Sequence, residues 1–284
     1  MQRTAGITSG SGSPVEEEIL RQDNSLLRIR YSLLAQLQNI TVNGKKSVII
    51  RCDRASTMEN STDDYRIQSF DLDTQMLLKT ALKDPSAVNL DKVSDIIVDQ
   101  SLKDQVFSKE AGRICYTIVQ VHTDGAAEAK QNNGIVFRRN LLNRLQQEFK
   151  AREETRGRSL QEWVCYVTFI CNVFDYLKVN NMPMVALVHP VYDCLMRLSK
   201  PDALMNEEEV DCLVVQLHRI GEQLEKVSNQ RMDELFFLLR DGFLLQEGLT
   251  SMTRLLLLEI LEFRAGGWML SGTAHKYYYS EIAD

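Results

Sequence analysis

The chain has 284 residues, of which 44% are hydrophobic and 25% charged, and its formal net charge is −6. This composition is typical of a globular protein with a sizeable core, and it disfavours a wholly disordered chain. A net negative charge also argues against a nucleic-acid-binding protein, because such proteins neutralise phosphates with Lys and Arg.

Residues 1–62 sustain no helical period beyond two or three turns. A Gly/Ser stretch over residues 6–14 precedes a short amphipathic segment. Two interpretations stay open: a disordered leader, with Met58 as the natural start, or a regulatory or targeting arm. We expect residues 1–62 to be a disordered leader, residues 63–270 a folded domain, and residues 271–284 a C-terminal tail.

From residue 71 onward, apolar residues recur at helical spacing. The first predicted helix, residues 71–83, stops before Pro85, because proline cannot continue a helix. The second begins behind Asn89, a good N-cap. The third follows Ser108, and a polar loop over residues 123–133 leads to a long fourth helix over residues 135–156.

Five further helices are predicted in the second half of the chain. Ser159 and Glu162 form a capping box for the fifth helix. Asn206 and Glu209 open the seventh helix in a similar way. The remaining helices cover residues 183–199, with a kink at Pro190, and residues 230–244 and 250–264. No segment alternates at period two for long enough to require a sheet.

The odd-numbered helices begin near residues 71, 108, 159, 206 and 250, intervals close to the roughly 40–47 residues of HEAT and armadillo repeats. One helix pair cannot bury its apolar face alone, so the spacing predicts an all-α, HEAT- or armadillo-like solenoid of about five antiparallel helix pairs. The fifth helix is apolar on nearly all sides, which predicts a place in the middle of the stack. Gly221, within an apolar stripe, predicts a close approach by a neighbouring helix.

Motifs for chemistry are absent from the sequence. It contains no GxGxxG, no GxxxxGK[ST] and no HExxH. The four histidines are far apart in sequence, and His218 is expected to be a packing residue. We therefore predict no catalytic residue, no cofactor-binding residue and no metal ligand, and a protein that is not an enzyme.

The six cysteines lack the spacing of zinc ligands, and five lie among apolar helical residues. They are expected to be free, buried thiols in a reducing compartment: the cytoplasm, with the nucleus as an additional location. No apolar run reaches the roughly 18 residues that span a membrane. The first residues lack a signal-peptide pattern, and Glu16, Glu17 and Glu18 disfavour a transit peptide.

Residues 137–149 contain the pattern F-R-x-x-L-L-N-R-x-Q-x-E-F on the predicted fourth helix. With several other stretches, this pattern resembles the middle domain of eukaryotic translation initiation factor 4G and its relatives. Residues 261–268 are similar to its closing L-x-x-R-x-x-x-W. Met232-Asp233 with Phe236 belong to the same closing stretch, and the remaining matches are Phe169-Ile170 with Val173-Phe174 and Ile220-Gly221 with Leu224. The resemblance covers residues 65–270.

This resemblance implies a five-pair HEAT stack that binds translation initiation factors, DEAD-box helicases and mRNA-bound adaptors. The short chain and the tail Lys276-Tyr277-Tyr278-Tyr279 are most like the small stand-alone members. For those, the resemblance implies the histone mRNA stem-loop-binding protein as partner, and a homodimer. One departure is that residues 242–253 contain no Lys or Arg, where the large factor carries a basic loop. The chain is therefore expected to be an adaptor in translation regulation without direct specific RNA binding; the alternative is a direct RNA-binding or mRNA-decay-linked module of the same fold.

Three groups of residues are candidates for partner contact. Arg139 and Lys150 lie on the solvent side of the fourth helix, the most basic segment, which suits either an acidic partner segment or solvent alone. The polar stripe of the fifth helix either lines a binding surface or satisfies its hydrogen bonds internally; its candidates are Thr168, Asn172 and Asp175. The tail tyrosines either dock on the last helix or face a partner: Tyr277, Tyr278 and Tyr279.

Overall fold

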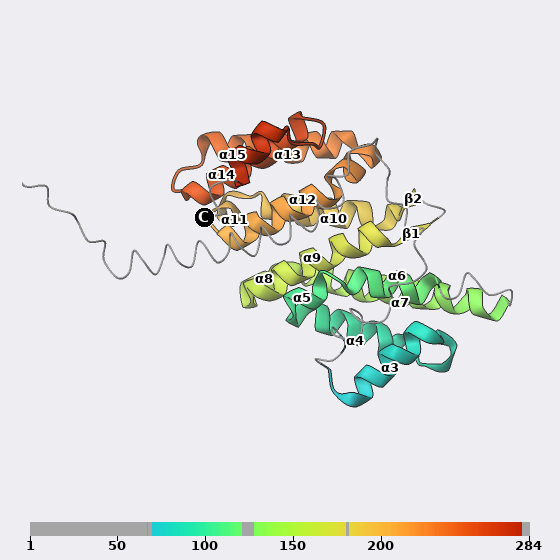
Figure 1. The fold of residues 1–284 in the computed structure, drawn as a ribbon. Helices are drawn as coiled ribbons and strands as arrows, with labels where there is room; N and C mark the ends of the chain where they lie inside the picture. The colour runs from blue at the N-terminus through green and yellow to red at the C-terminus, as the bar shows by residue number, and fades with distance from the viewer. Residues whose placement is uncertain (1–66, 68–69, 121–127, 180–181, 280–284) are drawn as a thin grey trace, which may run out of the picture. The chain divides into compact units, whose positions relative to one another are not determined.

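The computed structural model describes residue 67 and residues 70–120, 128–179 and 182–279, and for residues 128–133 and 279 the backbone alone (Figure 1). Residues 55–269 form one unit, and residues from 270 onward belong to a second, so each is described by itself. The predicted leader lies outside the described residues. Among the described residues, no helix is both long and apolar enough to cross a membrane.

Almost all described residues are helical, in agreement with the predicted all-α class. The elements in chain order are α3 (Leu72–Lys83), the 3-10 helix η1 (Pro85–Ala87), α4 (Leu90–Lys103), α5 (Gln105–Ser108), α6 (Ala111–Gln120), α7 (Glu128–Lys150), α8 (Arg152–Arg158), α9 (Leu160–Tyr176), β1 (Lys178–Val179), β2 (Met182–Pro183), α10 (Val185–Leu198), α11 (Pro201–Leu204), α12 (Glu207–Val227), α13 (Asn229–Leu245), α14 (Ser251–Ala265) and, in the second unit, α15 (Gly272–Tyr279).

Helix starts follow the predicted capping residues. The side chain of Asn89 accepts hydrogen bonds from the backbone N–H groups of Asp91 and Lys92. Ser159 caps α9 and Asn206 caps α12 in the same manner. Each cap satisfies N–H groups that have no partner within their own helix, which fixes where the helix begins.

Several boundaries differ from the predictions. The third helix was predicted to follow Ser108; Ser108 instead ends the one-turn helix α5, where its hydroxyl donates to the carbonyl of Gln105, and α6 begins at Ala111. Helix α7 begins at Glu128, within the predicted loop, and ends at Lys150, before α8 starts at Arg152. A two-residue antiparallel ladder, β1 with β2, connects α9 to α10 and was not predicted.

The helices of residues 55–269 form two layers of successive pairs. In one layer α3, α6, α9, α12 and α14 pack against one another in that order; in the other, α4 packs on α7 and α10 on α13. This is a HEAT-like stack, as the repeat spacing predicted. Helix α9 lies in the middle, where it contacts helices α4, α5, α6, α8, α10 and α12.

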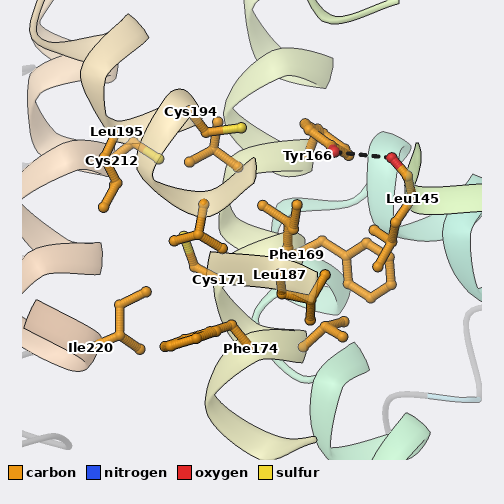
Figure 2. Close-up of a cluster of buried hydrophobic side chains, with 14 of the residues drawn as sticks. Leu145, Tyr166, Phe169, Cys171, Phe174, Leu187, Cys194, Leu195, Cys212 and Ile220 are labelled. Carbon is orange, nitrogen blue, oxygen red and sulfur yellow. Dashed lines mark hydrogen bonds between the residues drawn. The ribbon is translucent and has the colours of Figure 1, made fainter. Parts of the chain in front are cut away.

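The core is continuous around α9 (Figure 2). All residues from 163 to 174 are buried, including the polar Thr168 and Asn172. The hydroxyl of Tyr166 donates to the carbonyl of Leu145 on α7 at 3.1 Å, so a buried phenol finds a partner there. The prediction that α9 is covered on nearly all sides is therefore confirmed.

Gly221 supplies the predicted close approach, but its neighbour is a side chain rather than a helix backbone. A Cβ atom at position 221 would overlap the indole ring of Trp268. That indole donates to Glu225 at 2.5 Å and meets the rings of Phe236 and Phe263 edge-on. Trp268 itself has a positive φ of 61°, an uncommon backbone conformation for a residue other than glycine. The residues that follow α14 are thus held against α12 by the packing of Trp268 on Gly221 and its hydrogen bond to Glu225.

The five described cysteines are free and buried, as predicted: Cys115, Cys165, Cys171, Cys194 and Cys212. Burial raises the pKa of Cys212 to about 12. Burial also raises the pKa of Cys171 well above its usual value. Since the thiolate is the reactive species, these thiols behave as small apolar side chains. The sixth, Cys52, lies outside the described residues.

Candidate protein-binding surfaces

Arg139 and Lys150 lie on the exposed side of α7, opposite the buried residues Phe137, Leu141 and Leu145. Among the described residues, no ion pair engages either cation. The sequence placed both on this side because 100° per residue separates the apolar stripe from the polar one. Both charges are available to an acidic segment, and contact with a partner remains a prediction.

Two other cations of this region, Arg144 and Arg158, are already paired. Arg144 contacts Asp95 at 2.9 Å, Asp99 at 2.8 Å and Glu148 at 3.1 Å, so it ties α7 to α4 as well as forming the predicted i,i+4 pair. Arg158 contacts Glu162 at 2.5 Å. The basic character of the segment is therefore weaker at the surface than the sequence indicates.

The polar stripe of α9 is mostly internal. Thr168 is 3% exposed and its hydroxyl lies 3.8 Å from the sulfur of Cys212. Asn172 is fully buried and its side chain donates to the carbonyl of Lys109. Asp175 is partly exposed and pairs with Arg219 of α12 at 2.9 Å. Only Asp175 therefore presents surface to a partner, and its role stays a prediction.

The tail tyrosines lie on α15. Tyr277 is 67% exposed, whereas Tyr278 is 5% exposed. Their rings meet edge-on, with centroids 5.0 Å apart. The side chain of Tyr279 lies outside the described residues. Of the two described rings, that of Tyr277 is the one whose exposure suits an interface.

A buried ion pair that the sequence did not predict joins α8 to α12. Glu209 is fully buried and accepts hydrogen bonds from Arg156 at 2.7 and 2.6 Å and from the indole of Trp163 at 2.9 Å. The hydrogen bond with Glu209 raises the pKa of Arg156 above its usual value. The partners of Glu209 lie 53 and 46 positions earlier in the chain, so sequence periodicity could not reveal this ion pair.

His218 is a packing residue, as predicted. Its ring lies 4.1 Å from that of Phe263 and contacts the buried carboxylate of Glu259 at 3.0 Å. Within the described residues, no group of three or more His, Cys, Asp or Glu side chains is arranged to hold a metal ion.

A stack of helix pairs with charged side chains on its outer faces is the architecture of a helical-repeat scaffold. Residues 58–266 match the family model of the MIF4G domain. The chain is 80% identical over 228 residues to MIF4G domain-containing protein B of Danio rerio, covering 80% of this chain and 100% of the relative. It is 69% identical over 226 residues to MIF4G domain-containing protein of Homo sapiens, covering 80% of this chain and 99% of the relative. The chain therefore belongs to the MIF4G family, whose domain is a protein-binding module of translation factors.

Proposed function

We propose that this protein is a non-enzymatic adaptor in translation regulation. It connects an mRNA-bound protein of the histone stem-loop-binding class to initiation factors and DEAD-box helicases, in the cytoplasm and also in the nucleus. The observation that carries the proposal is the match of residues 58–266 to a domain of translation factors. Arg139 and Lys150 of α7, which are exposed and form no ion pair among the described residues, would provide a surface on which the adaptor captures a partner.

The tests of this proposal start from cell extract. The full chain, immobilised on beads, is expected to retain initiation factors and an mRNA-bound adaptor equally well with and without RNase. Loss of all partners after RNase treatment would favour the alternative, a direct RNA-binding or decay-linked module of the same fold.

Charge argues for a protein partner rather than RNA. The net charge of the chain is −6, and of the cations on α7 and α8, Arg144, Arg156 and Arg158 are paired with carboxylates. We predict no specific RNA binding by the isolated protein, because binding to phosphates requires several free cations. Submicromolar affinity for a histone-type stem-loop at physiological salt, measured by fluorescence anisotropy, would contradict this.

The basic side of α7 predicts a matched mutational result. Arg139→Glu with Lys150→Glu should weaken capture of an acidic partner peptide at least tenfold, because opposite charges steer the encounter and fix register. The melting temperature should hardly change, since both side chains are exposed. Arg144→Glu is the contrasting variant: it should lower the melting temperature by breaking contacts with Asp95 and Asp99. Normal peptide capture by the folded double variant would mean that this side of α7 is merely solvated.

We also propose that the protein is a homodimer, from its likeness to the small members of the family. The last helix of the stack, α14, is rich in leucine, which by itself would favour an apolar dimer interface. Leu256 and Leu257 of this helix are buried within the same chain, however, so they are not available to a second copy. Light scattering should give the mass of a dimer at about 100 μM protein, a concentration at which even a weak isologous interface is occupied. A monomeric mass at that concentration would remove the dimer.

A further inference from the structure

Helix α13 is apolar on two opposite sides. Its inner side carries Met232, Leu235, Phe236 and Leu239, all buried against the stack, where α13 contacts α10, α12 and α14. Its outer side carries four large apolar residues that are exposed to solvent: Phe237 at 54%, Leu238 at 44%, Leu244 at 64% and Leu245 at 76%. At 100° per residue these four fall within an arc of about 120°.

An outer helix side in a globular protein is normally polar, so this apolar arc needs an explanation. The arc is close in width to the apolar stripe with which an amphipathic helix packs on another element. Phe237 and Leu245 are eight residues apart, about 12 Å along the helix axis. That length accommodates two turns of a second helix laid alongside, with anchors at i, i+4 and i+7.

The charges of this side are mainly negative. Glu234 and Asp241 fall inside the apolar arc, and Glu247 follows shortly after the end of the helix; all three are exposed. The one exposed cation of this side in the described chain, Arg240, is paired with Asp241 at 2.7 Å and lies over the ring of Phe237 at 5.1 Å. The ring of Phe237 thus already accepts a guanidinium on its face.

We propose that the outer side of α13 binds an amphipathic, Lys- or Arg-rich helix of a partner protein. Leucine-like side chains of the partner would cover Phe237, Leu244 and Leu245, and its cations would meet Glu234 and Asp241. The inference extends the proposed function, since it gives the adaptor an apolar, acidic surface in addition to the basic side of α7. Two surfaces of opposite charge allow two partners to be distinguished by charge.

A second copy of the chain fits this side less well. In a two-fold interface the same patch meets itself, so Glu234 and Asp241 of one copy would lie near the same carboxylates of the other. Like charges brought together in this way oppose association. A basic helix relieves the same carboxylates, which is why charge complementarity favours it.

The test uses the full chain and a synthetic 16-residue peptide of leucine and lysine at helical spacing. A matched peptide carries glutamate in place of each lysine. Fluorescence anisotropy should show a micromolar Kd for the lysine peptide and at least tenfold weaker binding of the glutamate peptide. Phe237→Ser with Leu245→Ser should weaken the lysine peptide at least tenfold, and Glu234→Gln with Asp241→Asn at least threefold. Thermal melts of each variant check that it is folded.

Two control variants show whether binding of the lysine peptide is specific to α13. Leu72→Ser with Met76→Ser removes an exposed apolar pair on α3 and should leave the affinity unchanged. Arg139→Glu with Lys150→Glu should also leave it unchanged, so the proposed function and this inference can fail independently. The proposal would be overturned if Phe237→Ser with Leu245→Ser bound the lysine peptide with the same affinity as the parent chain. The proposal would also be overturned if Phe237→Ser with Leu245→Ser converted a dimer to a monomer while the lysine peptide still bound. A second copy of the chain would then occupy the outer side of α13.

Discussion

Replacing Arg156 by methionine should lower the free energy of unfolding by about 3–5 kcal/mol, because it leaves a buried carboxylate without its cation. Glu209 has no exposed surface, and after the substitution the indole of Trp163 alone would donate to it. For a domain of this size each kcal/mol corresponds to roughly 2–4 °C, so the melting temperature should fall by at least about 6 °C. Differential scanning calorimetry measures the change.

The matched control for Arg156 is Arg158→Ala. That arginine is 61% exposed in its pair with Glu162, so its loss should leave the melting temperature almost unchanged. Arg156→Met combined with Glu209→Met should recover most of the stability, because no unpaired charge remains buried. If Arg156→Met is as mild as Arg158→Ala, the pair does not join α8 to α12 as described.

Gly221→Val should cost about 3 kcal/mol, a fall of roughly 6–12 °C in melting temperature, because the new side chain occupies the place of the Trp268 indole. The ring cannot move away freely, since Glu225 holds its N–H and two other rings flank it. The measurement is a thermal melt of each variant beside the parent chain.

A variant that lacks the Trp268 indole tests whether overlap with this ring causes the loss of stability. In Trp268→Ala, the further change Gly221→Ala should be neutral or stabilising, because alanine is the better helix former by about 1 kcal/mol. Gly157→Ala gives the same gain of propensity where nothing lies within 4 Å of the new methyl group, so it should stabilise the protein. An equal loss from Gly221→Ala with and without Trp268 would refute the overlap.

Local chemistry was predictable from the sequence. Asn89, Ser159 and Asn206 cap helices because their side chains reach N–H groups two or three residues away, and such contacts are visible in the sequence. The burial of α9 was equally visible, since its periodicity leaves only a narrow polar stripe. The start of α7 at Glu128 was not, because residues 128–133 are mostly polar and lack an apolar helical period, so their sequence resembles a loop.

Contacts between distant segments were not predictable. Two contacts join residues more than forty positions apart: the ion pair of Arg156 with Glu209, and the packing of the Trp268 indole against Gly221. Sequence periodicity placed Thr168 and Asn172 on a polar stripe, but the packing of α5, α6 and α12 on α9 determines that this stripe is covered. The position of a helix can therefore be predicted from local sequence, whereas the exposure of a candidate binding residue depends on how the helices pack.

We propose that one molecule of this protein holds an mRNA-bound protein and the initiation machinery together. The most direct measurement immobilises the histone stem-loop-binding protein on beads and adds RNase-treated extract depleted of this chain. We expect initiation factors on the beads only when the purified chain is added back, and less of them with Arg139→Glu and Lys150→Glu. If the chain binds each partner singly but added initiation factor displaces it from the beads, the two partners compete and the protein is not an adaptor.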